Sequence, residues 1–122
     1  MVNTTTFLDS IKAAIRAGII SDASHGAVGD DNTAPTAGDT TLGNELFRNA
    51  RQEYTEGVSD VVISLFLNSL EANGESLVEV GLFDAASAGN MLQRSLVTTI
   101  TKTSGLEVWI DVEEQIDVTQ WR

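Results

Sequence analysis

Four polar residues in the first third of the chain could coordinate a hard cation: Asp30, Asp31, Asn32 and Asp39. Carboxylate and amide oxygens are the ligands that calcium prefers. Their order, however, does not follow the Asp-x-Asp-x-Asp-Gly spacing of an EF-hand loop, and no bidentate glutamate closes the set. A solvated turn explains these residues better, so we expect the chain to hold no metal and no cofactor.

Catalytic chemistry has little to work with in this sequence. His25 is the only histidine and there are no cysteines, which disfavours histidine-based catalysis and transition-metal sites and rules out thiolate chemistry. Glu113 and Glu114 are adjacent, so in a strand they would face opposite sides of the sheet. Glycine-rich phosphate loops, Gly-x-Ser-x-Gly elbows and His-Glu-x-x-His helices are also missing. The sequence therefore predicts a protein that is not an enzyme.

The composition favours one acidic, soluble domain. The chain has 122 residues, 42% of them apolar, and no apolar run approaches the roughly 18 residues of a spanning helix, so we expect no membrane insertion. The 18 acidic residues outnumber the 7 basic ones and give a net charge of −11, which argues against nucleic-acid binding. Such a composition, with only Lys12 and Lys102 as lysines, indicates either adaptation to concentrated salt, which screens repulsion, or an ordinary acidic surface.

Residues 6–19 carry the one clear helical pattern. Large apolar side chains return every three or four residues along one face, at Phe7, Leu8, Ile11, Ile15 and Ile19. Thr6 is the predicted cap, and residues 1–20 form an amino-terminal amphipathic helix. Such a helix usually packs on its own sheet. The alternative is a groove on a partner subunit, which makes Phe7, Ile11 and Ile15 candidate interface residues.

Residues 21–43 contain few large apolar side chains and the only proline, Pro35. We expect an extended loop or arm here, in which residues 26–29 could still form a short strand. Loops of this length are uncommon inside compact domains and usually contact something. Pro35 is therefore a further candidate interface residue.

Residues 44–122 show the alternation of a β-sandwich. Strands are predicted at residues 46–54, 58–68, 76–83, 91–102 and 106–118. With the short strand in the arm, the fold class is mainly β: an antiparallel β-sandwich of about six strands with one amino-terminal α-helix, in a single domain. In the third of these strands we expect Val78, Val80 and Leu82 on one face.

The last predicted strand is longer than a small sheet needs. It places Val108, Ile110 and Val112 inward and Trp109 outward. An exposed edge of this length invites pairing unless another subunit covers it. Trp109 and Trp121 are thus candidate interface residues, because exposed tryptophans are enriched at contacts.

Residues 78–92 hold the clearest local signature. An apolar strand containing Gly81, Leu82 and Phe83 stops at Asp84, a short side chain that can bond its own backbone, and Gly89 then supplies positive φ before a second strand. This is the pattern of a tight hairpin. It shapes the fold and offers no catalytic group.

Four sequence blocks, taken in order, resemble small structural proteins of tailed viruses of bacteria and archaea. The blocks are Leu-Gly-Asn-Glu-Leu-Phe-Arg at 42–48, Val-Glu-Val-Gly-Leu-Phe-Asp-Ala at 78–85, residues 89–94, and Thr-Lys-Thr at 101–103. The likeness covers about residues 26–117 and is to fibre, collar and baseplate-associated proteins. It departs at Ala88, where the family pattern has a second glycine, and the helix at 6–19 lies outside it.

The resemblance implies a non-catalytic virion protein. It would anchor a fibre or build a collar as a homo-oligomer, a trimer or pentamer, beside other proteins of the tail, neck or capsid. A capsid decoration or turret protein at a symmetry axis is the close alternative. A carbohydrate- or protein-binding module, using Trp109 and the arm, is a third. Together with the acidic composition, the resemblance suggests a virus of a salt-loving host.

Overall fold

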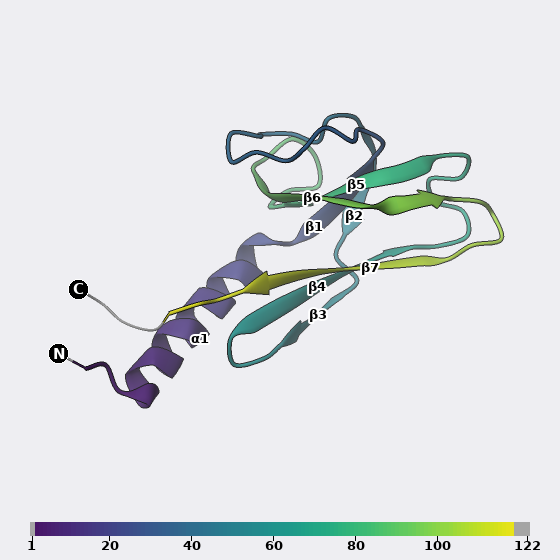
Figure 1. Cartoon of the computed structure of the whole chain (residues 1–122). Coiled ribbons are helices and arrows are strands. Elements are labelled where there is room, and N and C mark those ends of the chain that lie inside the picture. Colours follow the sequence, from purple (N-terminus) through teal and green to yellow (C-terminus); the bar gives the residue numbers. More distant parts are fainter. Residues whose placement is uncertain (1, 119–122) are drawn as a thin grey trace.

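The structure, a computed structural model that describes residues 2–118, consists of one helix and seven strands (Figure 1). The elements are α1 (Thr5–Asp22), β1 (His25–Gly29), β2 (Glu45–Ala50), β3 (Glu53–Glu56), β4 (Asp60–Leu67), β5 (Ser76–Phe83), β6 (Met91–Thr101) and β7 (Val108–Gln115). The strands form a four-stranded sheet in the order β2-β1-β5-β6 and a three-stranded sheet in the order β3-β4-β7, all pairs antiparallel. The predicted mainly β, two-sheet fold class is confirmed.

The main core lies between the two sheets. Val28, Val80 and Leu82 of the four-stranded sheet pack in the same buried cluster as Ile63 and Leu65 of β4. Alternation in β4 and β7 places their apolar residues in this layer, as the sequence predicts. Gly26 lets the sheets approach closely, because a Cβ there would lie 2.1 Å from Leu65 Cδ2.

The arm expected at residues 21–43 is too long, and the short strand considered at residues 26–29 is present. Residues 25–29 form β1, which lies between β2 and β5 and is buried from Gly26 onward. Small side chains make this strand look like a loop in the sequence, yet their size is what a tightly covered central strand requires. The loop proper is therefore residues 30–44.

The single strand expected at 46–54 is also wrong. β2 and β3 belong to different sheets, and the chain crosses between them at Arg51 and Gln52. The backbone N–H of Arg51 donates to Ser24 and that of Gln52 to Ser64, so each linking residue is bonded to a different layer. The structure consequently has seven strands where about six were expected.

Register shifts in β5 and β6 change which residues face the core. The shift between Leu77 and Glu79 places Leu77 with Val80 and Leu82 in the main core, and Val78 does not share their row as expected. In β6, Val97 and Ile100 both pack against the core. Strict alternation would have put these two residues on opposite faces, so β-bulges invalidate the simple pattern here.

Helix α1 does not lie flat on either sheet, contrary to the expectation that it packs on the sheet of its own domain. None of its residues is buried, and only Ile19 and Ile20, near its end, pack against the core. The helix projects from one end of the sandwich (Figure 1). Its amino-terminal cap is Thr4, whose hydroxyl accepts from Phe7 N–H at 3.2 Å, and not Thr6. No helix among residues 2–118 has the length and apolar character needed to cross a membrane.

Polar contacts attach the helix to the body. Arg51 donates to the carbonyls of Ile20 and Ala23, which satisfies acceptors that a helix end leaves free. Further along, Lys12 donates to Ser59 Oγ at 3.1 Å and Arg16 Nε to Glu56 Oε1 at 3.2 Å. On the apolar face of the helix, Phe7 and Ile15 are exposed, whereas Leu8, Ile11 and Ile19 are half-buried.

Candidate functional site

The loop formed by residues 30–44 covers the outer face of the four-stranded sheet. On that face the strand register aligns Arg48, Ala27, Gly81 and Arg94 in one row. The two small residues in the middle leave room for Leu42, which is 4% exposed and packs in a second buried cluster with Ala27 and Phe83. Two arginines thus flank an apolar contact that holds the loop down.

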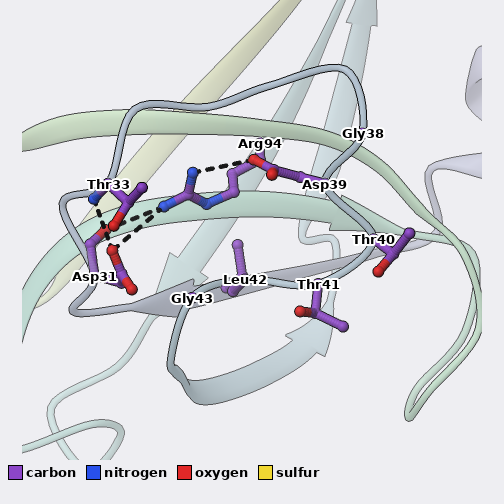
Figure 2. Close-up of a pocket in the computed structure, with 9 residues that line it drawn as sticks. All are labelled: Asp31, Thr33, Gly38, Asp39, Thr40, Thr41, Leu42, Gly43 and Arg94. Atoms are coloured by element: carbon purple, nitrogen blue, oxygen red, sulfur yellow. Dashed lines mark hydrogen bonds and ion pairs between the residues drawn. The ribbon is translucent and has the colours of Figure 1, made fainter.

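Arg94 of β6 contacts four acceptor groups, three of which belong to the loop. Its Nε donates to Glu79 Oε1 at 2.8 Å, one Nη to Asp39 Oδ2 at 3.3 Å, and the other Nη to the Asp31 carbonyl at 3.3 Å, with the Asp31 carboxylate 3.9 Å away. Figure 2 shows the Arg94 guanidinium between Asp31 and Asp39, the two limbs of the loop. We call Asp31, Asp39, Glu79 and Arg94 the Arg94 clamp. It ties both limbs of the loop to the sheet.

Glu79 joins the two ends of the loop. Its carboxylate accepts from the backbone N–H groups of Asp31 at 3.0 Å, Gly43 at 2.8 Å and Asn44 at 2.9 Å. The residue is fully buried, and Gly29 beside it has no room for a Cβ, which would lie 2.5 Å from Glu79 Oε2. Three amide donors and one guanidinium donor compensate for burying this charge.

The surroundings of the clamp carboxylates favour their ionised forms. Burial alone would raise the pKa of Glu79, but the hydrogen bonds from Asn44, Arg94, Gly43 and Asp31 outweigh it and lower that pKa. Hydrogen bonds from Thr33 lower the pKa of Asp31, and those from Thr36 lower the pKa of Asp39, with Arg94 adding to both. The clamp is therefore an assembled set of charges at neutral pH.

These pKa directions predict acid sensitivity. A carboxylate whose pKa is lower in the folded chain binds fewer protons when folded, so its contribution is complete at neutral pH and is lost as the pH falls. We expect the free energy of unfolding to decline from about pH 5 to about pH 3. Glu114 acts in the opposite direction, because burial raises its pKa. Urea unfolding of the wild-type chain and of the Glu79→Gln variant at a series of pH values measures the effect. The free energy of unfolding should fall less with pH in the variant than in the wild type. An equal fall in both would exclude Glu79 as the source of the acid sensitivity.

The predicted hairpin signature forms a second polar network beside the loop. Asp84 accepts from the backbone N–H of Asn90 at 2.7 Å and from its side chain at 3.0 Å, and these bonds lower the pKa of Asp84. Gly89 has φ +71°, as predicted, and Ala88 has φ +51°, a conformation that favours glycine. Arg48 donates to the carbonyls of Ala85 and Ala88 and lies 3.6 Å from the Phe83 ring centroid.

Neither protein-family models, nor curated proteins, nor solved structures gave a match to this chain. The geometry of its own residues therefore has to carry the functional argument. Three of the four sequence blocks meet in the clamp and hairpin. Residues 42–48 supply Leu42, the end of the loop and Arg48. Residues 78–85 supply Glu79 and Phe83, and residues 89–94 supply Arg94. Thr101–Thr103 lies elsewhere, where buried Lys102 donates to Asn73 Oδ1 at 2.9 Å.

A hollow of about 340 Å³ opens between the two limbs of the loop. Its lining consists of Asp31, Thr33, Gly38, Asp39, Thr40, Thr41, Leu42, Gly43 and Arg94 (Figure 2). Of the three carboxylates considered for calcium, those of Asp31 and Asp39 form ion pairs with the Arg94 guanidinium, at 3.9 and 3.3 Å. The third, Asp30, accepts from the Asn44 side chain at 2.8 Å. Among residues 2–118 no group of three or more His, Cys, Asp or Glu is placed to hold a metal ion.

The sole histidine has one polar neighbour of note. His25 Nδ1 lies 2.8 Å from Ser24 Oγ, a Ser–His contact that the sequence alone did not suggest. A working nucleophile also needs a third group that orients the imidazole and donors that stabilise an oxyanion. In the described part of the chain no carboxylate is bonded to the His25 ring. Of the catalytic arrangement, Ser24 and His25 therefore provide only the contact between a hydroxyl and an imidazole.

The sequence-predicted interface residues are spread over three places. Phe7, Ile11 and Ile15 form one row along α1, Pro35 is exposed on the loop, and Trp109 is exposed on β7. Trp121 lies outside the described residues. The structure does not bring these residues together into one site. Glu79, Arg94 and Arg48, which build the clamp and hairpin networks, were not among the predicted site residues.

Proposed function

We propose that this protein is a non-enzymatic structural component of a tailed virus particle, a fibre-attachment or collar component of the tail or baseplate, that assembles by self-association. The proposal combines the resemblance of the sequence blocks with one structural observation, an amphipathic helix that its own domain leaves uncovered. A capsid decoration or turret protein at a symmetry axis would need the same property and is the rival placement.

The uncovered helix carries the proposal. Phe7 is 51% exposed and Ile15 is 39% exposed, with Ile11 between them at four-residue spacing on the same face of α1. In proteins most of the stability of a helix comes from tertiary packing of its amphipathic face. Packing of this row against another chain would stabilise the helix and remove its apolar side chains from solvent.

Charge also favours self-association through α1. The helix has two acidic residues, Asp9 and Asp22, and two basic ones, Lys12 and Arg16, whereas the whole chain carries −11. Copies of an acidic protein repel one another least where the local charge is balanced, and concentrated salt screens the remainder. A helix with balanced charge therefore opposes the approach of a second copy less than the acidic parts of the surface do.

Sedimentation in molar KCl tests this proposal. We expect the whole chain to form one defined oligomer, and the Phe7→Glu/Ile15→Glu variant to be monomeric while its β-sheet signal in circular dichroism stays unchanged. Leu70→Glu is the matched control, because Leu70 is 84% exposed in a turn remote in sequence from the helix, and it should keep the oligomer. A wild-type chain that stays monomeric at high concentration would contradict the proposal. Trimers or sixfold species favour the tail, and pentamers favour a capsid vertex.

One observation favours the binding-module alternative. Trp109 is 53% exposed and its ring lies 4.7 Å from that of Phe66 on the outer face of the three-stranded sheet. Exposed aromatic pairs can stack on sugars or on apolar side chains. A stable monomer whose tryptophan fluorescence responds to glycans, and no longer does so after Trp109→Ala, would favour this function over the structural one.

A further inference from the structure

A hollow of about 350 Å³ lies at the base of α1, where the helix meets both sheets. Its apolar walls are Ile19, Ala23, Leu82 of β5 and Leu92 of β6. Two carboxylates, Asp22 and Glu114 of β7, complete the lining together with Gly18. We call this hollow the helix-base pocket. It combines an apolar interior with negative charge and includes no basic residue.

Glu114 is the unusual member of this pocket. It is half-buried, its Oε1 is shielded from solvent, and that oxygen accepts no hydrogen bond from residues 2–118. Burial without a compensating partner raises the pKa of Glu114. An acceptor left in this condition costs stability, and a donor brought in by a ligand would remove that cost.

The chain does not supply that donor from its described part. Six of its seven lysines and arginines lie among residues 2–118, and all six are engaged in hydrogen bonds elsewhere: Lys12 with Ser59, Arg16 with Glu56, Arg48 with Glu45, Arg51 with Ile20 and Ala23, Arg94 within its clamp, and Lys102 with Asn73. Among residues 2–118, no basic side chain is therefore left over to match the negative charge of this pocket.

We propose that the helix-base pocket binds a lysine or arginine side chain of a basic partner protein. The methylene stem packs between Leu92 and Ile19, and the cationic head reaches the carboxylates of Glu114 and Asp22. Long basic side chains suit such a site because their stems are apolar and their ends are charged. This proposal stands on the pocket alone and does not depend on the virion function or on the oligomer formed through α1.

Titration of the whole chain with n-hexylammonium, followed by amide chemical shifts in an NMR spectrum, tests the proposal. The amine mimics the stem and head of a lysine, and 1-hexanol is the uncharged probe of the same length. We expect the amine to shift the amides of Gly18, Ala23 and Leu92 and to bind about tenfold or more tightly than the alcohol. Equal affinity of the two probes, or shifts located elsewhere, would overturn it.

Three variants separate the pocket from general charge effects. Glu114→Gln should reduce amine affinity about tenfold or more and leave hexanol binding unchanged. Gly18→Leu should abolish binding of both probes while the protein stays folded, because a Cβ at Gly18 meets nothing within 4 Å and leucine is a better helix former than glycine. Glu107→Gln, an exposed acidic residue outside the pocket, should change neither affinity. Loss of self-association in Glu114→Gln would assign the pocket to a second copy and overturn the proposal.

Discussion

Replacing Glu79 by glutamine is expected to lower the free energy of unfolding by about 3–5 kcal/mol, the cost of breaking a buried ion pair by removing one partner. The change keeps the size of the side chain but removes the charge that pairs with Arg94, whose side chain is only 4% exposed. It also places an amide NH₂ group opposite backbone N–H donors that now share one carboxylate. The loss therefore has two sources, an uncompensated buried cation and donors without acceptors.

Urea unfolding monitored by circular dichroism measures this loss, and limited proteolysis of the loop at residues 30–44 locates it. Glu107→Gln, an exposed change of the same chemistry, should stay within about 0.5 kcal/mol of wild type. Replacing Glu79 and Arg94 together by leucine and methionine should still be costly, because the N–H groups of Asp31, Gly43 and Asn44 lose their acceptor. A stable, protease-resistant double variant would show that the ion pair matters and the loop amides do not.

The parts of the fold that were predictable are those where one face is buried and the other is wet. β7 follows this rule, since Val108 and Ile110 flank the exposed Trp109. β4 follows it in a weaker form: every second residue from Val61 to Leu67 is buried, but its other face also carries apolar side chains. Both strands were located with small errors at their ends. Their pattern reflects burial directly, so it is readable without knowledge of the partner strands.

The central place of β1 in its sheet and the β2–β3 crossing were not predictable for a physical reason. In β1 the buried residues are small because Leu65 on one side and the loop on the other leave no room, and small residues also occur in loops. In β2 and β3 no residue is fully buried, so no apolar alternation marks the point where the chain changes sheets. Tertiary packing determines both features, and local pattern does not record it.

The Arg94 clamp was hidden because charged residues are ordinarily assigned to the surface. Glu79 stands among apolar neighbours in β5 and faces the loop side of the sheet, away from the main core. Arg94 is the one charged residue in β6. A lone acid in one strand and a lone base in the neighbouring strand were the available indication of an ion pair, but only the register shows that they meet.

The apolar contact of the loop is the second place where a single substitution should have a large effect. Leu42→Ala is expected to cost about 2–5 kcal/mol, the range for removing a buried leucine side chain. Leu42 packs with Ala27 and Phe83 and covers Gly81, where a Cβ would lie 2.9 Å from Leu42 Cδ2. We expect the lower half of that range, because the cluster is small and the loop can settle into the space. Leu70→Ala, at an 84% exposed leucine, is the matched control and should change little.

Combining Leu42→Ala with Gly81→Ala distinguishes packing from loop flexibility. Gly81→Ala alone forces its new methyl group against Leu42, which costs about 1–3 kcal/mol as overpacking. In the double variant the methyl group occupies part of the space that Leu42 vacates. The loss in free energy of unfolding of the double variant should therefore be smaller than the sum of the two single losses, by about 0.5 kcal/mol or more. Strict additivity in urea unfolding would mean that the two residues do not share a contact. A favourable coupling would establish that Gly81, the glycine at the centre of the hairpin signature, is required because Leu42 lies over it.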